Sequence, residues 1–318
     1  MSFYTMGIDV GGTKIAYGLF DEDKNLIKRI KMPSDKTQSR EAFFDGICEE
    51  ISGILEAEGI PKSRLQGIGV GMPSYILFEE GKIIRTSNLP NIRDFPARSY
   101  VMDKMGGVPV VIDNDANTGA LAEFRRGAGR GFQHMLYCAV STGISTGIII
   151  NGQLFRGSYG WAGESGHMIV VPGAGIECGC ENKGCIMSYC SGSMIVKHVQ
   201  QKIAEGSPTA MAELAGSADR ITTVHILQAY DQGDALALWA VEQMALNLGV
   251  WLFNQYLLLN INCFVLGGGL LHFGDRLFKR VRDVFDAYNK NDLPVYFKTA
   301  ELGEDFGMIG AAELITEL

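Results

Sequence analysis

Two short runs, Gly163-Glu-Ser-Gly-His-Met168 and Cys178-Gly-Cys-Glu-Asn-Lys-Gly-Cys185, place one histidine and three cysteines within nineteen residues. Three thiolates and an imidazole complete a tetrahedral set of ligands for Zn²⁺, and a closed set is typical of a structural metal rather than a hydrolytic one. Glycines at positions 179 and 184 allow the backbone to bend so that the sulfur atoms can reach one ion. We therefore predict the zinc ligands His167, Cys178, Cys180 and Cys185.

The alternative for this cluster is a disulfide or a set of ordinary buried thiols. A Cys-x-Cys pair is too close in sequence to bridge comfortably, so the metal is the better interpretation. Glu164 precedes His167 by three residues. A metal that fixes the histidine would hold this carboxylate as well, forming a rigid wall for a polar ligand. The rest of the chain should supply the opposite wall.

Composition excludes several classes of protein. The chain has 318 residues, enough for one large domain or two, and 47% of them are hydrophobic. The net charge of −8 without a Lys/Arg block disfavours nucleic acid and anionic membranes as partners. Seven cysteines and no signal peptide at the N-terminus predict a reducing, cytoplasmic protein. The apolar stretch 245–265 is interrupted by amides, which favours a buried helix and a strand over a membrane span.

The N-terminal pattern predicts an antiparallel meander of strands at 4–10, 15–20 and 26–31. Its first turn reads Asp9-Val-Gly-Gly-Thr-Lys14. Successive glycines allow backbone N–H groups to converge on an anion, while the threonine and the lysine add a hydroxyl and a charge. Asp9, at the strand end, could face a hydrated Mg²⁺. The alternative is a plain glycine-rich hairpin turn.

The hydrophobic pattern then alternates between helices and strands. We predict helices at 39–58, 98–106, 113–126, 191–204, 224–230, 235–258, 275–288 and from 308, and strands at 65–71, 108–112, 134–140, 148–151, 261–266 and 295–298. Residues 85–90 are expected to form a polar loop.

A cluster of polar residues, Asp113-Asn-Asp-Ala-Asn117, follows the strand predicted at 108–112. Ligands bind at the carboxyl ends of strands in open α/β sheets, so Asp115 is the best candidate for a general base. Aspartate and asparagine are also favoured at helix N-termini, and a capping cluster is the alternative interpretation.

The second hairpin, with the turn Ser141-Thr-Gly-Ile-Ser-Thr-Gly147, resembles the first and indicates a weak internal repeat. Two similar halves would then face each other across a cleft. Gly267-Gly-Gly269 follows a predicted strand and suits the close approach of a planar or phosphorylated ligand. A tight turn between strand and helix is the alternative.

Taken together, these motifs resemble the ROK family of sugar kinases and repressors, within the actin/hexokinase-like ATPase superfamily. The resemblance covers nearly the whole chain. It rests on the order and spacing of five motifs: Asp9–Lys14, Asn114–Asn117, Gly163–His167, Cys178–Cys185 and Gly267–Gly269.

The resemblance implies a two-lobed α/β fold of the actin-like (ribonuclease H-like) ATPase type, with mixed sheets flanked by helices and the active site in the cleft between the lobes. Residues 1–117 with 305–318 would form the N-terminal lobe, and residues 118–304 the C-terminal lobe that carries the zinc motif. A homodimer is also implied.

The family pattern implies a role for each motif. Asp115 would be the base that accepts the proton of the sugar hydroxyl, usually the 6-OH. The sugar would be bound by Asn88, Asn114, Asp115, Glu164 and His167. The nucleotide phosphates and the Mg²⁺ that accompanies ATP would be bound by Asp9, Gly11, Gly12, Thr13, Lys14, Thr142 and Gly143. Gly267, Gly268 and Gly269 would lie near the adenosine, and His167 would link the structural zinc to the sugar.

The sequence departs from the family pattern at three places. The second phosphate turn has side chains at three usual glycine positions: Ser141, Ser145 and Thr146. Met187 stands where the family has a glutamate that reaches a sugar hydroxyl. Ser74 stands where a glycine is usual.

We therefore consider three functions. The first is an ATP-dependent kinase of a hexose or an N-acetylhexosamine, and the second is a non-catalytic sugar sensor, motivated by the altered turn and Met187. The third is a transcriptional repressor, which would need an N-terminal DNA-binding module, whereas only five residues precede Met6.

Overall fold

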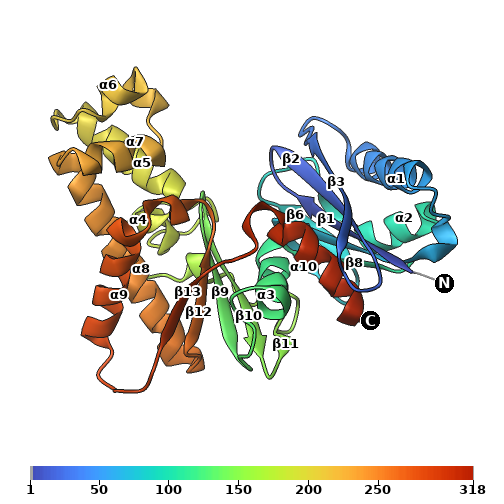
Figure 1. The fold of residues 1–318 in the computed structure, drawn as a ribbon. Helices are drawn as coiled ribbons and strands as arrows, with labels where there is room; N and C mark the ends of the chain where they lie inside the picture. Colours follow the sequence, from blue (N-terminus) through green and yellow to red (C-terminus); the bar gives the residue numbers. More distant parts are fainter. Residues whose placement is uncertain (1–2, 318) are drawn as a thin grey trace. The chain divides into compact units, whose positions relative to one another are not determined.

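A computed structural model describes residues 3–317 of the chain. Within them the chain forms two compact units, coloured along the sequence in Figure 1. The first contains the residues up to Tyr137, the segment Gly147–Gly163 and the residues from Ala300 onward; the second contains Cys138–Thr146 and Glu164–Thr299. These boundaries differ from the expected ones, because residues 118–137, 147–163 and 300–304 lie in the first unit.

The first unit is built on a five-stranded sheet with the order β3-β2-β1-β4-β8. Strands β1, β2 and β3 form the predicted antiparallel meander, and β4 and β8 extend it with parallel strands. The strands are β1 (Tyr4–Val10), β2 (Lys14–Phe20), β3 (Leu26–Pro33), β4 (Leu65–Met72) and β8 (Val110–Asn114).

Helices cover both faces of this sheet. On one face, α1 (Arg40–Ala57) and α2 (Ala97–Lys104) pack into a core that includes Met6, Ile8 and Val10 of β1. On the other face, α10 (Phe306–Leu314) lies so close to the strands that a Cβ at Gly69 would collide with the Ala311 carbonyl. The helix predicted at 39–58 begins with Ser39 as its N-cap, since the Ser39 Oγ accepts a hydrogen bond from the backbone N–H of Ala42.

A small three-stranded sheet in the first unit was not predicted. It consists of β5 (Ser74–Leu77), β6 (Lys82–Thr86) and β7 (Arg93–Phe95), in the order β5-β6-β7. The expected polar loop at 85–90 is therefore wrong at its start, where Arg85 and Thr86 belong to β6. The strands are three to five residues long, too short for alternation of polar and apolar residues to mark them.

The second sheet has the order β11-β10-β9-β12-β13, and the division between the units falls within β9 and β10. Its strands are β9 (Met135–Val140), β10 (Ile144–Ile150), β11 (Gln153–Leu154), β12 (Cys263–Gly267) and β13 (Tyr296–Thr299). Strand β10 begins four residues earlier than predicted, so the second turn shortens to residues 141–143.

The helices of the second unit are α4 (Met187–Cys190), α5 (Gly192–Ala204), α6 (Met211–Ala215), α7 (Thr223–Asp231), α8 (Ala235–Leu259) and α9 (Asp275–Tyr288). Helix α8 is long and apolar enough to cross a membrane by length and composition, yet 56% of its most apolar window is buried in the structure. That burial is typical of a core helix. The predicted pattern of a buried helix followed by a strand is confirmed by α8 and β12.

Candidate functional site

The first turn connects β1 to β2 in the first unit, directly after Asp9. The N–H of Gly11 donates to the carbonyl of Lys14 at 2.9 Å, which closes the hairpin. This amide is therefore engaged within the turn rather than directed at an anion. Gly12 lies beside Asn88, whose Cβ is 2.9 Å from the position that a Cβ at Gly12 would occupy. Two predicted ligand residues from different parts of the sequence thus meet at this turn.

Asp9 and Asp115 carry interacting charges at the same end of the first sheet. Burial raises the pKa of Asp9 to about 6, the charge of Asp115 adds to the effect, and Lys14 opposes it. Burial also raises the pKa of Asp115, against a hydrogen bond from the backbone N–H of Ala116 at 3.0 Å. Each carboxylate would gain from a cation or a proton, which suits one to metal binding and the other to proton acceptance.

The residue that caps α3 (Asp115–Arg126) is Asn114. Its Oδ1 accepts from the N–H of Ala116 at 2.8 Å, and its Nδ2 donates to the carbonyl of Ser74 at 3.2 Å. The capping interpretation is therefore correct for Asn114, while Asp115 is the first helical residue. Ser74 is buried, and its Oγ donates to the carbonyl of Met72.

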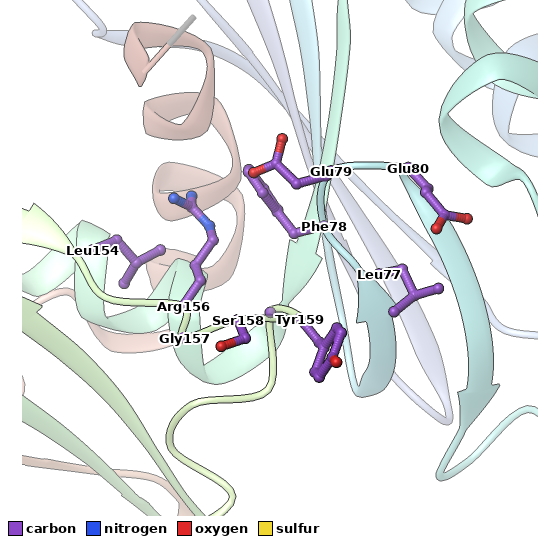
Figure 2. Close-up of a pocket in the computed structure, with 10 residues that line it drawn as sticks. Leu77, Phe78, Glu79, Glu80, Leu154, Arg156, Gly157, Ser158 and Tyr159 are labelled. Carbon is purple, nitrogen blue, oxygen red and sulfur yellow. The ribbon is translucent and has the colours of Figure 1, made fainter.

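A buried ion pair fixes the end of β8 and was missed by the sequence analysis. The Nε of Arg156 lies 2.7 Å from Oδ2 of Asp113, and the other carboxylate oxygen accepts from Asn117 Nδ2 at 2.8 Å. The guanidinium of Arg156 also lies over the ring of Phe78, 3.9 Å from its centroid. Figure 2 shows Arg156 and Phe78 among the residues that line a pocket in this unit. These contacts orient the backbone that carries Asp115.

In the second unit, the ligand atoms of His167, Cys178, Cys180 and Cys185 all lie within 4.8 Å of one another. Cys178 Sγ is 3.4 Å from His167 Nδ1, and Cys180 Sγ is 3.6 Å from Cys185 Sγ. A disulfide would require about 2.05 Å between sulfurs, so the described cysteines are free thiols. The Nε2 atom of His167 lies 3.9 Å from a carboxylate oxygen of Glu164. The prediction that these four residues lie together is therefore confirmed.

The second turn departs from a simple phosphate loop. Thr146 is buried, and its Oγ1 lies 2.6 Å from Ser165 Oγ and 2.8 Å from Gln255 Oε1. This hydroxyl is used inside the second unit and is not available to a phosphate. Gly143 lies beside Met187, whose Cε is 3.5 Å from the position of a Cβ at Gly143. The methionine thus approaches the turn itself.

A pocket of about 590 Å³ in the second unit adjoins this turn. It is lined by Ser141 and Thr142 from the turn and by Gly269 after β12. The N-terminus of α5 supports the turn, since Gly192 N–H donates to the Ser141 carbonyl at 2.8 Å. Gly268 has φ of +95°, and a Cβ there would collide with the Val140 carbonyl, so glycine is required. The volume falls in the range of small-ligand sites.

Other residues that line this pocket carry no sequence signal. They come singly from the surfaces of helices and turns, where polar residues are ordinary: Ser193, Lys197, Asp219, Thr222 and His272. The predicted ligand residues divide between the units. The first unit holds Asp9, Gly11, Gly12, Thr13, Lys14, Asn88, Asn114 and Asp115, and the second holds Thr142, Gly143, Glu164, His167, Gly267, Gly268 and Gly269.

Comparison with known proteins identifies the family. The profile of the ROK family matches residues 5–317. A glucokinase of Halalkalibacterium halodurans is 32% identical over 314 residues, covering 98% of this chain and 94% of the relative. The chain belongs to the ROK family.

The ROK family relatives include kinases and repressors. The crystal structure of a ROK glucokinase from Streptomyces griseus, in complex with glucose and AMPPNP, superposes with a TM-score of 0.82 at 32% identity and covers 99% of this chain and 100% of that one. The actin-like, two-lobed α/β fold expected from the sequence is therefore confirmed. A xylose repressor of Caldicellulosiruptor bescii is 30% identical over 268 residues, which are 84% of this chain and 64% of the repressor.

Proposed function

We propose that the protein is an ATP-dependent sugar kinase that transfers the γ-phosphoryl group to a hydroxyl, the 6-OH, of a hexose or N-acetylhexosamine. The observation that carries this proposal is the pair of partly buried carboxylates, Asp9 and Asp115, at one end of the first sheet. Similarity over almost the whole chain to two glucokinases supports it.

In the proposed reaction, the sugar oxygen attacks the γ-phosphorus of ATP. A new P–O bond forms to the sugar, the bond to the bridging β–γ oxygen breaks, and ADP leaves. Asp115 accepts the proton of the attacking hydroxyl, and its raised pKa brings its basicity nearer to neutral pH. Such transfers depend mainly on positioning and charge neutralisation. Mg²⁺ bound with ATP supplies that neutralisation, and Asp9 is the residue that would hold it.

We assign the sugar contacts to two sets of residues. In the first unit these are Asn88 and Asn114 with Asp115, and in the second they are Glu164 and His167. The side-chain amide of Asn114 is engaged at both ends by Ala116 and Ser74, so its contact with sugar would use remaining lone pairs or hydrogens. Glu164, whose carboxylate lies 3.9 Å from the imidazole of His167, would accept hydrogen bonds from sugar hydroxyls.

We propose that His167, Cys178, Cys180 and Cys185 hold a structural zinc ion. For Zn–S bonds of about 2.3 Å, a tetrahedral arrangement places two sulfurs about 3.8 Å apart, and a sulfur and a nitrogen about 3.6 Å apart. The observed separations of 3.6 Å between Cys180 and Cys185 and 3.4 Å between Cys178 and His167 fit these values. The remaining imidazole nitrogen faces Glu164, as expected for a carboxylate that orients a histidine ligand.

For the nucleotide, we propose the pocket of about 590 Å³ beside Thr142 and Gly269 as the site of the adenosine. The triphosphate would extend from it along Thr142 and Gly143, and residues of the first turn are proposed as further phosphate ligands. Thr13 and Lys14 are exposed and could contact phosphate by hydroxyl and charge. The inward orientation of Thr146 removes one donor from this arrangement.

A sugar sensor without turnover is the second candidate. It is favoured by Met187 beside Gly143 and by the engaged hydroxyl of Thr146. The two candidates differ in ATP consumption.

We also propose a homodimer in the cytoplasm. An exposed apolar stripe on α8, which includes Leu246 and Leu257, is a suitable contact, and light scattering would measure the mass.

The deciding experiment is an ADP-release assay with Mg²⁺-ATP against a panel of hexoses and N-acetylhexosamines. Asp115→Asn removes the proposed base, and Asp103→Asn, at an exposed position of α2 in the same unit, is the matched control. We expect activity on at least one sugar in the wild type and the control, with a loss of about a hundredfold or more in Asp115→Asn. If no sugar in the panel increases ADP release, although the folded protein binds sugar, the result would establish the sensor instead.

A further inference from the structure

Three aromatic side chains form a surface group in the first unit, outside the residues assigned above. The rings of Tyr75 and Trp161 meet edge to face with centroids 5.6 Å apart, and Tyr159 lies 5.7 Å from Trp161. Tyr159 is 65% exposed and Trp161 is 38% exposed. Arg85, the cross-strand partner of Tyr75, lies over its ring at 4.5 Å. We call Tyr75, Tyr159 and Trp161 the aromatic platform.

The platform is held by the backbone rather than by a hydrophobic core. The indole Nε1 of Trp161 donates to the carbonyl of Ile76 at 2.9 Å, and the Tyr159 carbonyl accepts from the N–H of Phe78 at 3.3 Å. Gly160, with φ of +103°, brings the segment against β5, because a Cβ there would lie 2.8 Å from the Ile76 carbonyl. Large apolar rings are thus fixed rigidly in an exposed position, an arrangement that burial does not explain.

A pocket of about 240 Å³ adjoins the platform at Tyr159. Figure 2 shows Glu79 and Glu80 on the turn after β5, with Leu77, Ser158 and Tyr159 around the same pocket. Neither glutamate forms a salt bridge within residues 3–317, so both carboxylates can accept hydrogen bonds from a ligand. The site thus combines an apolar ring surface with carboxylates that can accept hydrogen bonds from hydroxyl groups.

The same pocket is linked to the proposed reaction centre. Arg156 lines it and forms the ion pair with Asp113, two residues before the proposed base. Tyr75 of the platform directly follows Ser74, whose carbonyl accepts from Asn114. All of these contacts lie within the first unit. Ser74 and Tyr75 are consecutive residues of β5, so one short strand carries both the carbonyl that holds Asn114 and one ring of the platform.

We propose that the platform and its pocket bind a second sugar ring, so that the substrate is a disaccharide of which only one ring is phosphorylated. The C–H face of a pyranose would stack on Trp161 and Tyr159, and its hydroxyls would donate to Glu79 and Glu80. The two carboxylates disfavour nucleotides and other anions at this place. This inference rests on the proposed sugar kinase for its reacting ring, but the binding itself requires no turnover.

The test is calorimetric binding without ATP, with maltose, cellobiose, sucrose and N,N′-diacetylchitobiose compared with glucose and N-acetylglucosamine. We expect at least one disaccharide to bind more tightly than its monosaccharide. Trp161→Ala should raise the Kd for that disaccharide about tenfold and change the Kd for the monosaccharide less than about twofold. The control is Phe155→Ala, an exposed aromatic of the same unit outside the platform, which should change neither.

Trp161→Phe keeps a ring for stacking but loses the hydrogen bond to Ile76, so it should retain binding within about threefold and guards against misfolding in the alanine variant. Equal affinities in wild type and Trp161→Ala, or no disaccharide bound, would overturn the proposal. So would a mass in light scattering that falls to that of a monomer in Trp161→Ala but not in Phe155→Ala, since the platform would then be a contact between copies. Monosaccharide phosphorylation without disaccharide binding would refute this inference alone, whereas disaccharide binding without turnover would refute only the kinase.

Discussion

Replacing Asp9 by asparagine should make the protein more stable while it removes the proposed metal ligand. In the folded protein the pKa of Asp9 is raised from 3.8 to about 6, first by burial and then by the charge of Asp115. The folded state therefore holds the proton more tightly than the unfolded state. Ionisation at neutral pH consequently opposes folding, and a neutral amide of the same shape is free of this cost.

The magnitude follows from the shift. A difference of about two pKa units corresponds to about 3 kcal/mol once both states are ionised, at pH 7 and above. The same relation gives about 1.6 kcal/mol at pH 5 and about 0.6 kcal/mol at pH 4, because the folded wild type is by then protonated. The stabilisation by Asp9→Asn should therefore grow as the pH rises from 4 to 7 and then level off.

The assay is urea unfolding of wild type and Asp9→Asn at several pH values without Mg²⁺ or nucleotide. A second series with Mg²⁺-ATP should stabilise the wild type and leave the variant almost unchanged, because the cation neutralises the Asp9 carboxylate. A variant that is less stable than the wild type at pH 7, or a difference that does not vary with pH, would refute the reasoning. Loss of kinase activity in this more stable variant would identify a charge kept for function.

Three further predictions concern the metal cluster, the base and the packing of α10. Cys178→Ser should abolish zinc binding, measured by metal analysis, and lower the melting temperature, whereas Cys48→Ser, a buried thiol of the first unit, should leave the metal content unchanged. The rate of phosphoryl transfer at saturating sugar should fall as the pH decreases through the raised pKa of Asp115, and its midpoint in a pH profile should lie above that of an ordinary aspartate. Gly69→Ala should cost more than about 3 kcal/mol of folding free energy, or prevent folding, because its Cβ would meet the Ala311 carbonyl; Gly53→Ala, in α1 with nothing near its Cβ position, should be neutral or stabilising in thermal unfolding.

The sequence was sufficient where one segment carries a complete signal. The meander from Tyr4 to Pro33, the end of β8 and the Cys/His cluster were all predicted, since strand periodicity and ligand spacing are local properties. The sequence predicted an N-cap among residues 113–117, but the structure was needed to assign it to Asn114 rather than Asp115. Boundaries of one residue depend on backbone geometry, which composition does not specify.

Contacts between distant residues could not be predicted. Asp113 and Arg156 are 43 positions apart, and Thr146 and Gln255 are 109 apart. Nothing in a single sequence indicates that these side chains meet. The consequence for function is direct, because the hydroxyl of Thr146 is a phosphate donor by residue type and a structural hydrogen-bond partner by geometry. Likewise, the platform residue Trp161 has no motif that distinguishes it from an ordinary surface aromatic.

The order of the strands would allow one sheet to separate the proposed metal binding from the proposed proton transfer. Asp9 pairs in register with Gly71 of β4, and Gly71 with Asp113 of β8, so the end of β4 lies between the two strand ends. Neighbouring strands are about 4.8 Å apart, which places β1 and β8 about 10 Å apart. Carboxylates on adjacent strands would share one cation or one proton. Asp115 follows β8 directly, so in the proposed reaction this separation would leave room for a phosphoryl group and a hydroxyl between Asp9 and the proposed base.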